Sequence, residues 1–504
     1  MGINKSKVPQ ILWPCSTEEN QWEALKDSRQ LKEYKEYRNK YRNHKYSPRY
    51  HFYAPDGKIN DPNGFTYWNG NYHLFYQQYP PADPRQHWGH AISKDLVHWK
   101  DLPTAIFPDP EKCVFSGNAI SEEYRVLAMY FGTESGIFVA ESKDPLLLNW
   151  EKLTGDAVIK ISEDAPYKIY DPHIRKEADG YYALSGVYRD TPYGRRMCQE
   201  QFYSEDLINW KYIGELMDEC PYLSTDDDGA CPYFIQMKDD QYCLFLFSHG
   251  TGPHIFSGTY DNKIHKFTPH HHIRLSSEGP MAGSLNAPCV TKGIDGNVYV
   301  IYNATEGIWP SNEYPRWGCM TLMYTVRLGD NNEPIIEPAP QIDTLREELL
   351  YQGGFKVAAG KEFEVPASGK ALEIELNVKM NGASSFTLDV FRSDKEKTSV
   401  KFNQRNELWR EITYVTIDTT DSSFEPLKFG RMPETIRFDS WDHTEDVKLR
   451  VFIDHCTVEV FYNGKVIFAM AHPSLPESNQ IYLKAGGYDI EVTDMKVWKM
   501  EEIM

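Results

Sequence analysis

The sequence has no long apolar run. Its 504 residues contain nothing near the roughly 20 consecutive apolar residues that a membrane helix requires. The N-terminal stretch MGINKSKVPQILWPC also lacks the apolar core of a secretory signal. We therefore expect a cytoplasmic protein with no membrane partner. A secreted chain trimmed of its signal would have the same sequence.

Basic residues are few relative to acidic ones. The chain has 54 Lys and Arg against 73 Asp and Glu, which gives a formal net charge of −19. A nucleic acid or an anionic membrane would need a basic face to bind. The charge balance therefore argues against both partners and suits an uncharged, small-molecule substrate.

Paired cysteines and metal-binding motifs are also missing. The nine cysteines run from Cys15 to Cys456 without metal-type spacing, and their odd number suggests reduced thiols. The consecutive histidines 270–272 would point to opposite faces of an extended segment, which is poor metal geometry. We expect neither a metal nor a cofactor.

Aromatic residues are abundant instead, at 14% of the chain with 33 Tyr. Their flat apolar faces with polar tips suit sugar binding, and an aromatic-rich β-core explains them equally well. The length predicts two or three domains. Residues 16–45 are highly charged with apolar residues at loosely helical spacing, so we predict a helical N-terminal extension over 1–48 that docks on the body.

From Tyr50 onward, short alternating aromatic and β-branched runs are separated by Gly, Asp, Asn and Pro, which is typical of an all-β fold. One segment recurs as SKDLVHW at 93–99, SKDPLLLNW at 142–150 and SEDLINW at 204–210. A four-stranded unit repeating at this period indicates a β-propeller, with room for about five blades over 49–340. We expect the Ser-x-Asp turn and its Trp to close one blade onto the next. The ligand site should lie where the inner strands converge.

The β pattern breaks near 335–360, where we predict a short charged helix or a linker over 341–358. Strands then resume and predict a C-terminal β-sandwich over 359–504. The expected fold is therefore all-β: a five-bladed β-propeller followed by a C-terminal β-sandwich, with a short helical N-terminal extension. The sandwich would support the propeller, extend its cleft or pair two copies as a homodimer.

The most informative motif is Asn60-Asp61-Pro62-Asn63-Gly64, which we place on a turn before a strand. Neighbouring donors could keep the Asp61 carboxylate ionised, as a glycosidic nucleophile requires. Taken alone, the motif is more typical of an ordinary turn, because all four of its residue types favour turns.

Further stretches accompany this motif in order along the chain. They are HFYAPDGKINDPNG, YHLFYQQYP, WGHAISKDLVHWKDLP, FSGNAI, YDPHIRK and VFIDHCTVEVFYNG. From about residue 50 to its end the chain resembles glycoside hydrolase family 32, the invertase, inulinase and levanase group. The resemblance implies a five-bladed propeller with a β-sandwich and retaining hydrolysis of β-fructofuranosides without a metal.

The resemblance also implies roles for individual residues. Asp61 matches the nucleophile, and Asp171 in Tyr170-Asp171-Pro172 matches the transition-state stabiliser. The positions that match sugar contacts are Asn60, Gln77, Trp88, Phe115 and Ser116. The apolar face of a furanose would pack on Trp88, although a role in blade packing is an equal alternative for that side chain.

The chain departs from the family pattern at the fructose pocket. Lys58-Ile59 stands where the family usually has Trp-Met, and Tyr170 stands where it has Arg. An Arg fork binds adjacent hydroxyls and keeps a neighbouring carboxylate ionised, and Tyr170 can do only part of this. We therefore expect Tyr170 to contact the sugar in an altered pocket.

The acid/base residue is the largest departure. The family carries it as Glu in a Glu-Cys-Pro motif that leads into a strand. Here Glu219-Cys220-Pro221 precedes a polar loop, whereas Ala230-Cys231-Pro232 precedes a strand and so fits the register better. A methyl group cannot donate a proton. We slightly favour Asp228, two residues upstream and on the same face, over Glu219 as the replacement. A solvated loop over residues 226–228 is an equal alternative.

The sequence thus predicts a retaining hydrolase of sucrose or short fructo-oligosaccharides. The Asp61 carboxyl should lie about 5–5.5 Å from that of the acid, whose pKa burial or a neighbouring carboxylate would raise. Two alternatives stay open. Ala230 favours a non-catalytic sugar-binding homologue. Lys58 and Tyr170 favour a related glycosidase or fructosyl-transferring enzyme with a shifted substrate.

Overall fold

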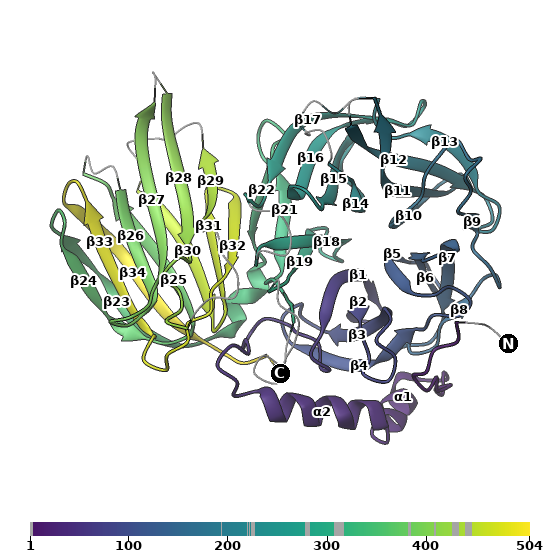
Figure 1. Ribbon diagram of the computed structural model, residues 1–504, viewed down its shortest axis with the longest axis horizontal. Coiled ribbons are helices and arrows are strands. Elements are labelled where there is room, and N and C mark those ends of the chain that lie inside the picture. The colour runs from purple at the N-terminus through teal and green to yellow at the C-terminus, as the bar shows by residue number, and fades with distance from the viewer. Residues whose placement is uncertain are drawn as a thin grey trace.

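Five antiparallel sheets, three of four strands and two of five, surround a central channel in the computed structural model of the protein (Figure 1). The structure describes residues 4–192, 194–218, 220, 222, 227–277, 283–306, 317–381, 385–407, 410–425, 433–438 and 446–503. The first blade consists of β1 (Ile59–Trp68), β2 (Asn71–Gln78), β3 (His87–Ser93) and β4 (Trp99–Ile106). The second consists of β5 (Val114–Ser121), β6 (Val126–Gly132), β7 (Gly136–Ser142) and β8 (Glu151–Lys152), with β9 (Ile159–Lys160) also pairing β7.

The remaining blades repeat this order from the channel outward. The third consists of β10 (Pro172–Glu177), β11 (Gly180–Thr191), β12 (Gly194–Ser204) and β13 (Lys211–Glu215). The fourth consists of β14 (Ala230–Lys238), β15 (Gln241–Ser248), β16 (Gly252–Asp261) and β17 (Lys266–Arg274). The fifth consists of β18 (Leu285–Lys292), β19 (Val298–Ala304), β20 (Cys319–Met320), β21 (Tyr324–Leu328) and β22 (Pro334–Pro338).

The repeated Ser-x-Asp segment lies within a blade, where it joins the third strand to the fourth. In the first blade Ser93 Oγ accepts from the backbone N–H of Leu96, and Asp95 Oδ1 accepts from that of His98. The Trp that ends the second segment makes a contact between blades. Trp150 of the second blade meets Phe75 of the first at 5.5 Å between ring centroids. The turn also reaches the neighbouring blade, because the Trp68 indole N–H of the first blade donates to the Asp144 carbonyl at 3.0 Å. The prediction that turn and Trp join one blade to the next is therefore confirmed between the first two blades.

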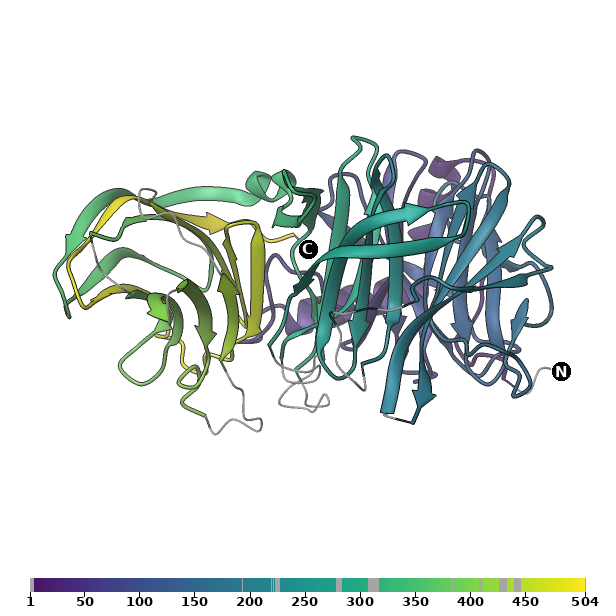
Figure 2. The same cartoon turned by 90° about the horizontal axis from the view of Figure 1, so that it is seen from above.

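Two six-stranded antiparallel sheets form the C-terminal sandwich (Figure 2). One contains, in spatial order, β23 (Arg346–Val357), β34 (Ile490–Met500), β25 (Ala371–Lys379), β30 (Val447–Asp454), β31 (Thr457–Tyr462) and β32 (Lys465–Met470). The other contains β24 (Glu362–Ser368), β33 (Gln480–Gly486), β26 (Ser385–Arg392), β27 (Thr398–Glu407), β28 (Arg410–Asp418) and β29 (Glu434–Phe438). Their facing apolar side chains make a separate core.

The linker predicted over 341–358 is wrong for most of its length. A 3₁₀ helix, η1 (Pro340–Leu345), leads directly into the edge strand β23. Most side chains of β23 are exposed or half-buried, so its sequence has the charged character of a linker. Strand pairing with β34 determines its structure.

The N-terminal extension folds as two helices, α1 (Glu18–Leu25) and α2 (Arg29–Tyr41). Thr17 and Ser28 cap them by accepting backbone N–H groups. Arg38 of α2 anchors the extension to the first blade through a 2.6 Å ion pair with Asp101 of β4. None of the described helices is long and apolar enough to cross a membrane.

Candidate active site

Four of the five inner strands are irregular at their first residues. The pairing register shifts within 59–62 of β1, 114–117 of β5, 230–233 of β14 and 285–288 of β18. Such a bulge re-aims a side chain that regular alternation would place elsewhere. The polar residues in these bulges are Asn60, Asp61, Ser116, Cys231 and Asn286. The bulges place chemically active side chains at the channel end of these four blades.

The Asn60–Gly64 motif is part of strand β1, so its placement on a turn before the strand is wrong. Turn-forming residues fit here because the bulge interrupts regular pairing between Ile59 and Pro62. Gly64 has φ +54°, and a Cβ at this position would lie 2.8 Å from Phe75 and 2.9 Å from Trp88. Glycine is therefore required at this position both by the backbone angle and by the available space.

Asp61 is held by two side-chain donors. Ser116 Oγ donates to Asp61 Oδ2 at 2.7 Å, and Gln77 Nε2 donates to the same oxygen at 3.1 Å. Burial raises the pKa of Asp61 above its ordinary value, and the Ser116 hydrogen bond and the charge of His249 oppose this rise. These donors come from β2 and β5 rather than from the motif itself, and they fix the orientation of the carboxylate without offsetting the effect of burial on its pKa.

Asp171 immediately precedes inner strand β10 and faces Asp61 across a thiol. Cys231 Sγ lies 3.3 Å from Asp171 Oδ2 and 3.7 Å from Asp61 Oδ2, and the Cys231 N–H donates to Asp171 at 3.2 Å. Burial and the nearby charge of Asp61 raise the pKa of Asp171 to about 7. Burial, Asp171 and Asp61 raise the pKa of Cys231 well above its ordinary range, so the neutral thiol acts as a donor between the carboxylates.

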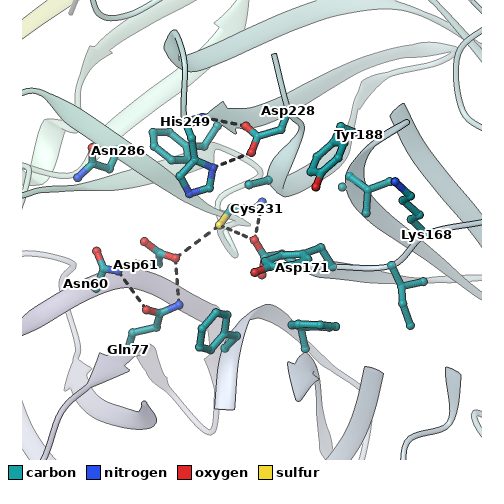
Figure 3. Close-up of a pocket in the computed structure, with 18 of the residues that line it drawn as sticks. Asn60, Asp61, Gln77, Lys168, Asp171, Tyr188, Asp228, Cys231, His249 and Asn286 are labelled. Atoms are coloured by element: carbon teal, nitrogen blue, oxygen red, sulfur yellow. Dashed lines mark hydrogen bonds and ion pairs between the residues drawn. The ribbon is translucent and has the colours of Figure 1, made fainter. Parts of the chain in front are cut away.

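Ala230 is the first residue of inner strand β14 and lines the same cavity. Asp228 also lines it, but its carboxylate binds His249, the residue that follows β15. Oδ1 accepts the His249 backbone N–H at 2.8 Å, and Oδ2 lies 2.7 Å from His249 Nδ1 (Figure 3). The hydrogen bond that His249 donates to Asp228 raises the pKa of His249, and the charges of Asp61 and Asp171 add to this effect. Glu219 lies outside the described residues.

These groups share a cavity of about 560 Å³, a size suited to a small ligand. The sequence-predicted residues that line it are Asn60, Asp61, Gln77, Phe115, Tyr170, Asp171 and Asp228. Tyr170 is 43% exposed, and its ring stacks on Phe131 with centroids 4.6 Å apart. Phe115 meets Tyr170 edge-on at 6.5 Å. Tyr170, Phe131 and Phe115 therefore form the aromatic wall.

The predicted sugar contact at Trp88 is wrong. Its side chain is fully buried, and its indole Nε1–H donates to the Phe115 carbonyl at 2.8 Å. The ring packs against Phe75 and Tyr130 between the first two blades. Ser116 is also buried and does not line the cavity, so the structure shows it positioning Asp61 rather than lying open to a sugar.

Sequence reasoning missed several lining residues, among them Phe131, Tyr188, His249, Asn286 and Trp317. A usable signal existed for His249, which directly follows the apolar strand β15, much as Gln77 lies one residue before the end of β2. Extending the search for polar residues from inner strands to second strands would have found it. Among the described residues, no group of three or more His, Cys, Asp or Glu side chains is arranged to hold a metal ion.

Comparison with known proteins agrees with this geometry. The family described as "Glycosyl hydrolases family 32 N-terminal domain" matches residues 51–333, and "Glycosyl hydrolases family 32 C terminal" matches residues 341–499. Sucrose-6-phosphate hydrolase of Escherichia coli is 25% identical over 485 residues, which cover 88% of this chain and 93% of that protein. Levanase of Bacillus subtilis is 25% identical over 506 residues, covering 90% and 71%.

Solved structures share the fold. Fructan 1-exohydrolase IIa from Cichorium intybus superposes with a TM-score of 0.80 at 22% identity, over 91% of this chain and 98% of that one. The family matches span most of the chain and include every site residue described above. The protein belongs to glycosyl hydrolase family 32 and is a glycosidase of the β-fructofuranosidase type.

Proposed function

We propose that this glycosidase cleaves small β-fructofuranosides, namely sucrose or short fructo-oligosaccharides, with retention of configuration through a fructosyl intermediate on Asp61. The proposal rests on the position of the Asp61 carboxylate. Its carboxylate is fixed by Ser116 and Gln77 in a cavity that also holds a second carboxylate, Asp171. A nucleophile held in place by donors avoids much of the entropic cost of attack.

Asp171 stabilises charge in this scheme. As the glycosidic bond breaks, positive charge develops at the anomeric carbon and at the ring oxygen of the sugar. Asp171 and Asp61 contact the same Cys231 thiol, so both carboxylates border the position of that carbon. The developing positive charge favours the ionised form of each carboxylate and is stabilised by both.

Cavity size and charge support a small, uncharged substrate. Asp61, Asp171 and Asp228 line the cavity. Lys168, a cation at its wall, is paired with Asp190 at 2.7 Å. A phosphorylated sugar would meet this excess of carboxylates, so we expect sucrose to be a better substrate than sucrose 6-phosphate. The relatives named above, a sucrose-6-phosphate hydrolase and a levanase, support a fructoside.

The test is fructose release from sucrose, sucrose 6-phosphate, an inulin-type oligosaccharide and a levan-type oligosaccharide. We expect release from sucrose or the short oligosaccharides, and a loss of roughly 10⁴-fold or more in Asp61→Ala. If the wild-type protein releases no fructose from any of the four, the proposed function is wrong. In that case Ala230 would favour a sugar-binding homologue instead.

A further inference from the structure

The retaining scheme needs a proton donor, and the position implied by the family resemblance cannot supply one. Ala230 presents a methyl group to the cavity. The sequence-based substitute, Asp228, is already engaged, because both of its oxygens accept hydrogen bonds from His249. A carboxyl group that accepts N–H donors on both oxygens has neither oxygen free for a leaving group and is badly placed to donate.

His249 has the geometry that Asp228 lacks. Its Nδ1–H points at Asp228 Oδ2 at 2.7 Å, which leaves Nε2 as the second donor of the imidazolium. Figure 3 shows the ring between Asp228 on one side and Asp61 on the other, with Cys231 below it. The side chain is 66% exposed and lines the cavity, so a ligand can reach it. A carboxylate bound to one ring nitrogen fixes the tautomer of the imidazole and the direction in which the other ring nitrogen points.

We propose that His249 is the general acid and base of this enzyme and that Asp228 is the residue that positions it. This inference rests on the proposed hydrolysis at Asp61 and corrects the assignment of the acid to Asp228. A histidine on the second strand of the fourth blade thereby replaces the missing glutamate of the inner strand.

The proton balance closes with this pair alone. Asp61 attacks the anomeric carbon, the bond from that carbon to the leaving oxygen breaks, and His249 Nε2–H protonates that oxygen. The neutral ring then takes a proton from water through Nε2. The water oxygen attacks the same carbon, the bond to Asp61 breaks, and fructose leaves with Asp61 ionised and His249 protonated again.

The charged and titratable groups that face His249 come from three blades. They are Asp61 on β1, Asp171 before β10, Asp228 before β14 and Cys231 on β14, together with Lys168, Tyr170 and Tyr188 of the third blade, which line the same cavity. The three carboxylates favour the imidazolium, which agrees with the raised pKa of His249. A protonated His249 beside an ionised Asp61 is the state that the first step requires.

The experiment compares two substrates that differ in their need for an acid. Sucrose has an alkoxide leaving group that must be protonated, whereas a nitrophenyl β-fructofuranoside can leave as the phenolate. For His249→Ala we expect kcat/KM on sucrose to fall by about 10²–10⁴-fold and kcat/KM on the nitrophenyl substrate by less than about tenfold. Azide can attack the fructosyl intermediate without a base. It should therefore restore turnover of the nitrophenyl substrate by His249→Ala, with β-fructosyl azide as the product.

Matched variants separate a catalytic role from a structural one. His249→Asn retains a donor for Asp228 but cannot carry the proton, so it should reproduce the effect even if His249→Ala fails to fold. His270→Ala, on the outer strand β17 of the same blade, should leave both substrates unaffected. Asp228→Asn should shift the alkaline limb of kcat/KM for sucrose down by about one pH unit, because the imidazolium loses its carboxylate partner.

The outcomes are distinct. Equal losses on both substrates in His249→Ala and His249→Asn overturn the inference, as does full activity on sucrose. A substrate-dependent loss that appears in Glu219→Gln instead of the His249 variants also overturns the inference. The proposed function survives each of these results. If the wild-type protein cleaves neither substrate, both fail.

Discussion

At the scale of single residues, the chemistry depends on which polar atoms are already engaged. Asp61 and Asp228 are both carboxylates at the edge of one cavity, yet their partners give them opposite roles. Ser116 and Gln77 orient Asp61 toward the ligand space, whereas His249 occupies both oxygens of Asp228. The hydrogen-bond partners decide which carboxylate attacks and which one positions a neighbour.

The aromatic residues give a prediction at this scale. Tyr170→Ala should raise KM for sucrose roughly tenfold, equivalent to about 1.4 kcal/mol of lost contact, because its exposed ring lines the cavity. Trp88→Phe should instead lower the free energy of unfolding by about 1–3 kcal/mol and leave KM within about twofold, because this side chain is buried between blades. Initial rates and urea unfolding measure both effects. A tenfold change in KM that appears in Trp88→Phe and not in Tyr170→Ala would contradict the assignment of Tyr170 to the aromatic wall.

At the scale of the strand, β1 combines catalysis with close packing. Its bulge turns Asp61 toward the channel, and three residues later Gly64 allows Phe75 and Trp88 to approach the backbone. The same strand therefore carries the nucleophile and packs closely within its own blade, and at Gly64 it also lies beside Ala119 of the second blade. Glycine and proline within a strand, which would ordinarily argue against one, are explained by these two functions.

Gly64→Ala tests the packing part of this account. The positive φ and the contacts under 3.0 Å should together lower the free energy of unfolding by about 2–5 kcal/mol. Gly70→Ala is the matched control, because Gly70 has φ +79° but a Cβ added there would have nothing within 4 Å, so only the backbone cost of about 1–2 kcal/mol remains. Urea unfolding of both variants measures the difference. Equal losses of unfolding free energy in the two variants would show that the contacts of the added methyl group with Phe75 and Trp88 have no cost.

At the scale of the whole molecule, a buried ion network joins the two domains. His51, just before the propeller, lies 2.8 Å from Asp454 of β30 and 3.0 Å from Glu459 of β31, and all three side chains are fully buried. Burial lowers the pKa of His51, but the hydrogen bonds to both carboxylates outweigh this and raise it from 6.5 to about 9. The sandwich is thus anchored to the propeller by a protonated histidine.

Stability should follow the protonation of His51. Since its pKa is raised in the folded state, its contribution is complete below about pH 6.5 and is lost as the pH rises through 9. His51→Gln should cost about 3–5 kcal/mol at pH 6, and the difference from wild type should shrink toward pH 10. Urea unfolding across this range measures it, with His270→Gln as the surface control. A difference independent of pH would contradict a charged His51.

Local patterns made much of the molecule predictable. The blade repeat follows from the turn at Ser93 and its copies, and the nucleophile motif follows from a bulge built by adjacent residues. Features set by distant pairing were not predictable. Trp88 is buried by the second blade, and β23 forms a strand because β34, far along the chain, pairs with it. His249 depends on both kinds of information, since only the fold brings it beside Asp61.

The central claim is double displacement at Asp61, and the configuration of a captured product tests it most directly. Fructose itself loses its anomeric configuration in water, so methanol is supplied as the acceptor during cleavage of sucrose and the methyl fructoside is identified by NMR. Retention predicts methyl β-fructofuranoside from the wild-type protein and none from Asp61→Ala. Formation of the α-anomer, or of the β-anomer at an undiminished rate by Asp61→Ala, would contradict the account.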